Sequence, residues 1–188
     1  MKVTHSILLA SLMLSFYACK NENSKIDSLV PSQSLAAYEC YFFFIADCPA
    51  SRNNIPKISE LSKKYKPLGL RVIGVVSDPF INMDYLHETL KELDFQIDIE
   101  IDSTLSIARK HDASVTPEVF LYKSGVLVYS GLLDNYYFEL GKHRKIVTTN
   151  YLELAIQSSL QNSPFEKRTE AIGCKINFDA RDIITSIH

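Results

Sequence analysis

The 188-residue sequence is poor in cysteine and glycine and has no large excess of charge of either sign. Its four cysteines are too sparse for a scaffold of disulfide bonds, so each cysteine has to be interpreted in its own context. Twenty basic against 22 acidic side chains leave a net charge of −2. This balance argues against a nucleic-acid partner, which needs a basic face. Length and composition fit one globular domain.

The spacings that hold metals or haem are absent as well. His87, His111 and His143 are scattered along the chain. The sequence contains no His-x-x-His or Cys-x-x-Cys pair for zinc and no Cys-x-x-Cys-His motif for haem. We therefore expect no metal and no other cofactor.

Long hydrophobic runs are missing except near the N-terminus, and that run is shorter than a membrane span. Residues 1–18 combine Lys2, an apolar stretch at residues 7–14 and Ala18 before Cys19, which is typical of a secretory signal. The small residue followed by cysteine resembles the bacterial lipoprotein signal. The resemblance implies lipidation of Cys19 and a membrane-anchored, extracytoplasmic protein of the cell envelope, facing the periplasm or the surface. An ordinary signal peptide that ends near a cysteine is the alternative.

The rest of the sequence predicts alternating strands and helices. Residues 19–37 are polar and predict a flexible tether, followed by a domain over residues 38–162 and a C-terminal tail, 163–188, which carries Cys174. Apolar runs or alternation predict strands at residues 40–46, 70–76, 96–101, 119–122 and 126–129, the last two joined as a hairpin. Amphipathic periodicity predicts helices after Ser51 and at residues 81–93, 105–111 and 151–160. This order indicates an α/β fold with a mixed sheet. We expect the tail, which lacks a strong period, to wrap the surface.

Cys48 lies where the first predicted strand ends and the first helix begins. Unpaired backbone N–H groups and the positive end of the helix dipole stabilise a thiolate at such a position, and both lower the thiol pKa. Pro49 suits the first helical turn, where its missing N–H costs nothing. Asp47 works in the opposite direction, because an adjacent carboxylate raises a thiol pKa. Cys48 is therefore a candidate nucleophile, and a small, inert, half-buried cysteine is the alternative.

The motif Phe-Ile-Ala-Asp-Cys-Pro-Ala-Ser at residues 44–51, followed by Pro56 and later by Val115-Thr116-Pro117, resembles the thioredoxin superfamily. Within it the chain is most similar to the redoxin group, related to alkyl hydroperoxide reductase and thiol-specific antioxidant proteins, over residues 38–176. The resemblance implies a thioredoxin-like fold, a central mixed β-sheet flanked by helices, with Cys48 at the head of the first long helix. It also implies a cis peptide bond before Pro117, with Thr116 and Pro117 positioning the substrate.

The sequence departs from both branches of that superfamily. Ser51 stands where thioredoxins carry a second cysteine, so Cys48 cannot close the usual short disulfide. Ile45 stands where peroxiredoxins carry the threonine that binds peroxide, and Tyr41 replaces their upstream proline. The second departure weakens the interpretation as a peroxidase.

Two further cysteines remain to be assigned. Cys174 lies in a Gly-Cys step that redoxin-domain relatives carry at the same point of the tail. It could resolve a mixed disulfide on Cys48, form a static disulfide that pins the tail, or never meet Cys48. Cys40 lies inside the first predicted strand, so we expect its thiol to be buried in the core and inert.

The sequence thus favours an extracytoplasmic thiol-disulfide oxidoreductase that uses a Cys-x-x-Ser nucleophile on a thiol or disulfide protein or on a small-thiol substrate. A thiol-dependent peroxidase, in which peroxide oxidises Cys48 to a sulfenic acid, is the alternative enzyme. A non-catalytic binding module with the same fold is the third hypothesis. Residues 131–141, with Lys142, His143 and Arg144 after them, should approach the active-site side and bind a substrate or partner, or else form a solvated loop.

Overall fold

The structure, a computed structural model, describes residues 38–179. The expected signal segment, the tether and Cys19 lie outside the described residues. The centre is a five-stranded sheet in the order β3-β2-β1-β5-β6. Its strands are β1 (Tyr38–Phe44), β2 (Leu70–Val76), β3 (Asp98–Ile101), β5 (Glu118–Lys123) and β6 (Val126–Gly131). The first three are parallel, whereas β5 runs antiparallel to β1 and β6 antiparallel to β5.

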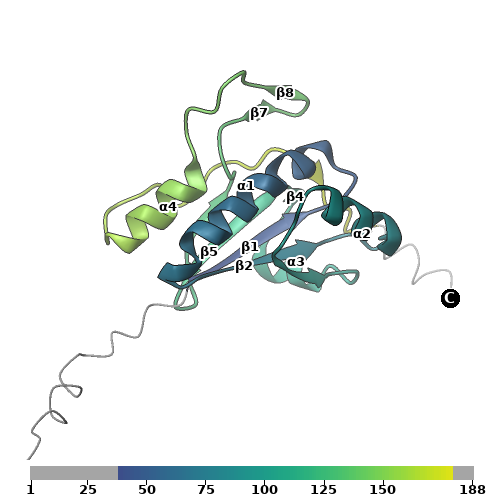
Figure 1. The fold of residues 1–188 in the computed structure, drawn as a ribbon, viewed down its shortest axis with the longest axis horizontal. Coiled ribbons are helices and arrows are strands. Elements are labelled where there is room, and N and C mark those ends of the chain that lie inside the picture. The colour runs from purple at the N-terminus through teal and green to yellow at the C-terminus, as the bar shows by residue number, and fades with distance from the viewer. Residues whose placement is uncertain (1–37, 180–188) are drawn as a thin grey trace, which may run out of the picture. The chain divides into compact units, whose positions relative to one another are not determined.

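Helices cover both faces of this sheet, which confirms the expected α/β fold with a central mixed sheet flanked by helices (Figure 1). They are α1 (Pro49–Tyr65), α2 (Met83–Glu92), α3 (Ser106–His111) and α4 (Tyr151–Leu160), and the 3-10 turn η2 (Lys66–Leu68) follows α1. Buried side chains of α1, α2 and α4 pack in one apolar cluster, and those of α3 pack in a second one. The predicted stripe of α1, which includes Ile55, Ile58 and Leu61, is buried as expected.

Strand β1 lies in the middle of the sheet and is buried on both faces. Cys40, Phe42 and Phe44 belong to the cluster under α1, whereas Phe43 belongs to the cluster under α3. An unbroken apolar run is what a strand between two helical layers requires. Because β1 is central, the residues that follow it leave the sheet at the middle of one edge, and Cys48 is among them.

The hairpin of β5 and β6 also follows the prediction. Ser124 and Gly125 at its turn have φ of 49° and 79°. Two successive residues of positive φ give the turn a twist that matches that of the flanking strands, and glycine adopts this conformation without strain. Local sequence therefore determines this connection.

A second, small hairpin was not predicted. β7 (Tyr137–Glu139) pairs with β8 (Lys142–His143), and Figure 1 shows this hairpin projecting beyond the sheet and the helices. Its strands are too short to show a periodic pattern, which is why the sequence indicates only a polar loop there.

The tail, over the part that the structure describes, is built into the fold. It passes the edge of β6, where the Ser130 N–H donates to Lys167 O and the Thr169 N–H to Ser130 O, each over 3.0 Å. Further on, β9 (Cys174–Lys175) pairs antiparallel with β4 (Val115–Thr116). Ile176 then enters the cluster under α3. The sequence had shown no regular element at Cys174.

Among residues 38–179, no helix has the length and apolar character that a membrane span requires.

Candidate active site

Cys48 is the N-cap residue of α1, with φ of −74° and ψ of 117°. No side chain caps this helix, and its first turn contains no acidic residue. The backbone N–H groups of Ala50 and Ser51 and the Ser51 hydroxyl nevertheless act on the Cys48 sulfur and lower its pKa. A negative charge on it is favoured there by the donors and by the helix dipole.

Thr116, the last residue of β4, faces this sulfur, and Pro117 follows it directly before β5. The Thr116–Pro117 peptide bond is cis, as the resemblance implied. The carbonyl oxygen of Thr116 lies 3.5 Å from the Cys48 sulfur and accepts a hydrogen bond from the protonated thiol. The hydroxyl of Thr116 donates to the carbonyl of Cys174 over 3.4 Å. Thr116 therefore contacts both cysteines.

Cys174 comes to the same place from the tail. Cys174 on β9 pairs with Thr116 on β4, and the Cys174 sulfur lies 2.9 Å from the Cys48 sulfur. Both residues are free cysteines in this arrangement. A disulfide bond is about 2.05 Å long, so less than about 1 Å of movement separates this contact from a covalent bond. Of the three sequence hypotheses for Cys174, the one in which the cysteines never meet is wrong.

The two sulfurs have opposite tendencies to ionise. Burial is the largest influence on the pKa of Cys48 and raises it, but the hydrogen bonds from Cys174, Ser51 and Ala50 together outweigh burial and hold this pKa below its ordinary value. Burial also leads the causes that raise the pKa of Cys174, followed by its hydrogen bond to Cys48 and by the negative charges of Cys48 and Asp47. Cys48 is thus the more acidic partner of the pair, the one that loses its proton first, and Cys174 is the partner that keeps its proton longer.

Gly173 allows this contact. A Cβ atom at residue 173 would lie 2.0 Å from the carbonyl oxygen of Thr116, far inside van der Waals contact. Only glycine lets the tail backbone lie this close to β4, so Gly173 sets the position of the Cys174 sulfur. Sequence reasoning noted the Gly-Cys step without this reason, because the approach of two segments far apart in the chain is not a local signal.

Two other side chains at the site were underrated from the sequence. Ser51 replaces the second cysteine of thioredoxins, but it is fully buried, its hydroxyl accepts from the Ile45 N–H over 3.4 Å, and it lowers the pKa of Cys48. Tyr137, on β7, lies close enough for the Cys48 charge to act on its phenol. Burial first, then Tyr136 and the Cys48 thiolate, raise the pKa of Tyr137. The expectation that this segment approaches the active-site side is confirmed.

A cavity of about 320 Å³ opens beside the two sulfurs. Its walls come from three places: the start of α1, the hairpin of β7 and β8, and the tail. The residues that line it are Pro49, Ala50, Tyr137, Leu140, Gly141, His143, Ile172 and Cys174. The lining is mostly apolar, and Cys174 is the part of the sulfur pair that faces it. A group bound in this cavity would lie within reach of disulfide exchange.

The remaining cysteine and histidine predictions have plain outcomes. Cys40 is fully buried, and burial raises the pKa of its thiol to about 12, so it is inert as expected. His111 is the last residue of α3 and is buried against Tyr122, with 2.8 Å between Nδ1 and the phenol oxygen. Within residues 38–179, no group of three or more His, Cys, Asp or Glu side chains is placed to hold a metal ion.

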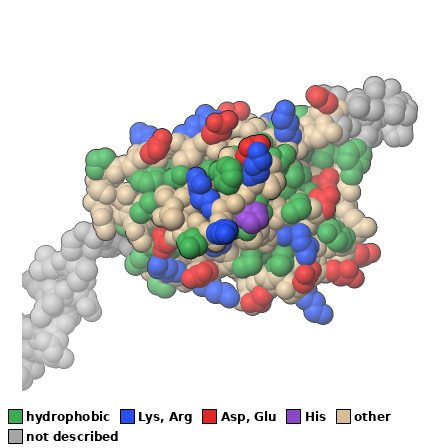
Figure 2. All heavy atoms as spheres, turned by 90° about the horizontal axis from the view of Figure 1, so that it is seen from above, with side chains coloured by type: hydrophobic (Ala, Val, Ile, Leu, Met, Phe, Trp, Pro, Cys, Tyr) green, Lys and Arg blue, Asp and Glu red, His purple; other side chains and the backbone are tan. Residues whose placement is uncertain are grey.

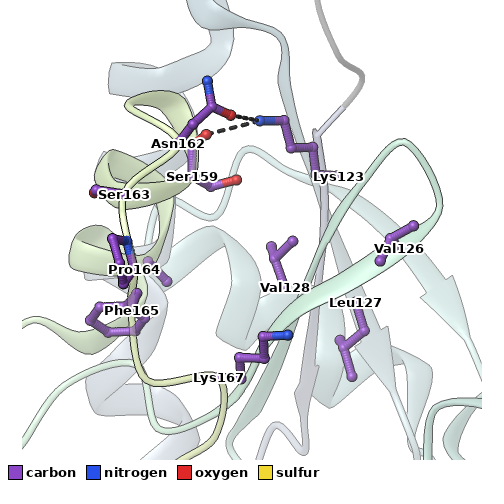
Figure 3. A pocket seen from close by; sticks show the side chains of 11 residues that line it. Lys123, Val126, Leu127, Val128, Ser159, Asn162, Ser163, Pro164, Phe165 and Lys167 are labelled. Atoms are coloured by element: carbon purple, nitrogen blue, oxygen red, sulfur yellow. Dashed lines mark hydrogen bonds between the residues drawn. The ribbon is translucent and has the colours of Figure 1, made fainter.

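A larger cavity, of about 480 Å³, lies between the β6 edge and the end of α4 (Figure 3). Lys123 spans part of it and donates to the carbonyl of Ser159 and to Oδ1 of Asn162, each over 2.9 Å. No cysteine or histidine lines this cavity, so it lacks the groups for redox chemistry. The sulfur pair, and not the larger volume, identifies the candidate active site.

We compared the sequence and the structure with those of known proteins. No protein-family model and no curated protein matches the sequence. Among solved structures, a hypothetical protein from Sinorhizobium meliloti is similar with a TM-score of 0.65 and 23% identity, covering 76% of this chain and 80% of its own. A candidate thioredoxin from Neisseria meningitidis is similar with a TM-score of 0.53 and 17% identity, covering 70% of this chain and 79% of its own.

A candidate thiol:disulfide interchange protein DsbE from Chlorobium tepidum has a TM-score of 0.52 and 18% identity, covering 69% of this chain and 84% of its own. At such identities the likeness concerns the fold alone. Together with the mixed sheet, the cysteine at the head of α1 and the cis proline opposite, it shows that this chain has the thioredoxin-like fold.

Proposed function

We propose that the protein is a thiol-disulfide oxidoreductase with Cys48 as nucleophile and Cys174 as resolving thiol. The observation that carries the proposal is the 2.9 Å contact between two sulfurs whose pKa values move in opposite directions. A thiolate attacks a disulfide sulfur, whereas a thiol does not. Cys48 therefore reacts with the substrate first, and Cys174 reacts second. Ser51 and Ala50 stabilise the attacking thiolate, and Thr116 and Pro117 position the substrate beside it.

The reaction has two exchange steps. The Cys48 thiolate attacks one sulfur of a substrate disulfide, a bond forms between them, and the other substrate sulfur leaves as a thiolate. Cys174 then loses its proton and attacks the Cys48 sulfur, which forms the Cys48–Cys174 disulfide and releases the second substrate sulfur. The substrate gains two electrons and, from the protein thiols and solvent, two protons. A dithiol reductant restores the two free cysteines by the reverse exchange.

Thiol trapping followed by mass spectrometry tests this function. Purified reduced protein, after treatment with a small disulfide, should contain a Cys48–Cys174 disulfide that dithiothreitol removes completely. A bond that forms but resists reduction would favour the static disulfide over the resolving pair. A Cys48 thiol that stays unmodified would contradict the oxidoreductase and favour the non-catalytic binding module. Consumption of hydrogen peroxide that is lost in Cys48→Ser would support the peroxidase instead.

We further propose that the protein acts outside the cytoplasm, anchored through a lipid on Cys19. The support is the signal-like pattern of residues 1–18 and the small residue before Cys19. Two free cysteines that cycle with a disulfide suit a compartment in which disulfides persist. In bacterial cells the full-length chain should fractionate with membranes, whereas Cys19→Ser should appear in the soluble extracytoplasmic fraction. Equal soluble amounts of both proteins would contradict the anchor.

A further inference from the structure

Exposed apolar side chains occur in the hairpin of β7 and β8, which forms one wall of the cavity beside the sulfur pair, and just after it. Leu140, which lines the cavity, is 63% exposed, and Phe138 and Ile146 in the same segment of the chain are 48% and 73% exposed. Large apolar side chains in such a group mark a binding surface rather than a solvated loop. Phe138 and Ile146 lie outside the lining of the cavity, so a small thiol bound there would leave them uncovered. An extended peptide segment would cover them.

The same hairpin is basic in a protein that is acidic overall. Residues 137–146 contain Lys142, Arg144 and Lys145 against Glu139, whereas the whole chain has a net charge of −2. Figure 2 shows Lys and Arg side chains around a histidine and hydrophobic side chains in the middle of the face that carries the hairpin. Glu139 pairs with Lys142 over 2.8 Å, and the Arg144 guanidinium lies 5.2 Å from the Phe138 ring centre. The excess positive charge therefore borders the apolar residues directly.

A negative charge also lies near the sulfur pair, outside the lining of the cavity. Asp47 precedes Cys48, and its charge contributes to raising the pKa of Cys174. A substrate that crosses the site thus meets a basic, apolar wall on the hairpin side and a carboxylate near the start of α1. This asymmetry orients a peptide as well as attracting it.

We propose that the cavity and the hairpin of β7 and β8 select peptide disulfides in which a large apolar residue adjoins the half-cystine and acidic residues follow on the hairpin side. The apolar side chain occupies the cavity beside Cys174, and the acidic residues face Lys142, Arg144 and Lys145. The proposal rests on the proposed function, because it names the substrate on which Cys48 and Cys174 act. The bonds formed and broken are those of the two exchange steps given above.

Single-turnover reduction of designed peptides tests the selection. Prereduced full-length protein, in excess, is mixed with symmetric disulfides of short peptides, and the peptide thiols are quantified by chromatography. The peptides carry phenylalanine or glycine after cysteine, followed by two glutamates or two lysines. We expect phenylalanine to react about tenfold faster than glycine. Glutamate should exceed lysine by roughly tenfold at low salt, and this ratio should fall towards one at high salt as charges are screened.

Protein variants assign these ratios to the hairpin. The triple variant K142Q/R144Q/K145Q should lose the preference for glutamate, and Leu140→Ser should lose much of the preference for phenylalanine. A matched control, K63Q/K66Q/K91Q, removes the same charge near the far end of α1 and should keep both preferences. Loss of the glutamate preference in this control would show that only net charge matters and would overturn the proposal.

The neutral 2-hydroxyethyl disulfide separates this proposal from the proposed function. If it oxidises Cys48 and Cys174 but all four peptides react at one rate, the oxidoreductase stands and the substrate selection is wrong. If neither it nor any peptide reacts, the proposed function fails and the selection fails with it.

Discussion

At residue scale, the ionisation of Cys48 depends on the polar groups at the start of α1 and on Cys174. The N–H groups of Ala50 and Ser51 and the Ser51 hydroxyl are three donors that lower the pKa of Cys48. Cys174 adds a fourth from 126 residues away in the chain. These hydrogen bonds outweigh burial and turn a cysteine that is 3% exposed into the more acidic partner of the pair.

The donor from Cys174 can be tested by two substitutions that differ in one hydrogen bond. Cys174→Ala removes the donor and should raise the pKa of Cys48, whereas Cys174→Ser keeps a hydroxyl donor and should raise it less. Because only the thiolate reacts, the rate of Cys48 alkylation should reach its half-maximum at a higher pH in the alanine variant than in the serine variant. Identical pH profiles for wild type and Cys174→Ala would show that Cys174 does not stabilise the thiolate.

Residue-scale reasoning from the sequence predicted part of this site. The strand end, the helix start and Pro49 together indicate a cysteine at a helix N-terminus, and the hydrophobic run around Cys40 indicates a buried thiol. The contact of Cys48 with Cys174 could not be predicted, because it depends on where the tail lies in three dimensions. The role of Ser51 was missed for a related reason: the sequence shows which residue is absent, but not which donor takes its place.

At element scale, the short pair of β4 and β9 holds the tail cysteine in place, and Gly173 permits it. Gly173→Ala places a methyl group 2.0 Å from the Thr116 carbonyl, so β9 has to move away. We expect a loss of about 1–3 kcal/mol in the free energy of unfolding and a marked slowing of Cys48–Cys174 disulfide formation. Denaturant unfolding and thiol trapping measure the two effects.

Gly125→Ala is the matched control for this variant. Gly125 has a φ of 79°, and a Cβ there would meet nothing within 4 Å. The alanine therefore strains the turn by about 1 kcal/mol without touching β9. Disulfide formation should proceed at the wild-type rate in this control. Wild-type kinetics in Gly173→Ala as well would refute the role given to Gly173.

The end of α3 carries a buried group that couples stability to pH. His111 lies among Tyr41, Phe43, Phe120 and Tyr122, with its ring centre 4.3 Å from that of Tyr41. Burial first, and then the charge of Lys110, lower the pKa of His111, against a weaker opposite effect of Glu39. Since its pKa in the folded protein is below that in the unfolded chain, the neutral imidazole favours folding above about pH 6.5, and this contribution is lost as the pH falls.

The variant His111→Gln tests this coupling, through the difference between its change in Tm with pH and that of the wild type. Between pH 7.5 and pH 5, the Tm of the wild type should fall more than that of the variant, by roughly 2–4 °C. Buried Glu118, whose pKa is raised by burial, titrates in both proteins, so its effect cancels in the comparison. Parallel Tm curves for the two proteins would mean that His111 does not titrate as inferred.

Elements with a strong local pattern were predictable, and those held by long-range contacts were not. The sequence predicts β2 and α4 with their observed bounds, because a buried run and an amphipathic stripe are local properties. It places the first strand two residues late, since Tyr38 and Glu39 join β1 through pairing with β2 and β5 rather than through hydrophobicity alone. Strand β9 has two residues and exists only because β4 lies beside it.

At the scale of the whole molecule, the cysteine pair links the first helix of the fold to the end of the described chain. A disulfide between Cys48 and Cys174 closes a loop of 126 residues. Closing so long a loop restricts the unfolded chain, and we expect the oxidised protein to be more stable by about 2–5 kcal/mol. In thermal unfolding this is a Tm increase of roughly 5–15 °C that dithiothreitol reverses. Cys174→Ser should show no such increase, and an equal increase in that variant would assign the effect to another oxidation.

The most direct test of the central claim is a mixed-disulfide trap with the two single variants. Reduced Cys174→Ala and Cys48→Ala proteins are mixed with a peptide disulfide, and the reaction is quenched with an alkylating agent. Intact mass spectrometry then measures the mass of each protein. We predict that Cys174→Ala accumulates one peptide on Cys48, because the resolving thiol is missing, and that Cys48→Ala accumulates none. A peptide adduct on Cys174 in the Cys48→Ala protein, with none on Cys48 in the other, would reverse the two roles and contradict the claim.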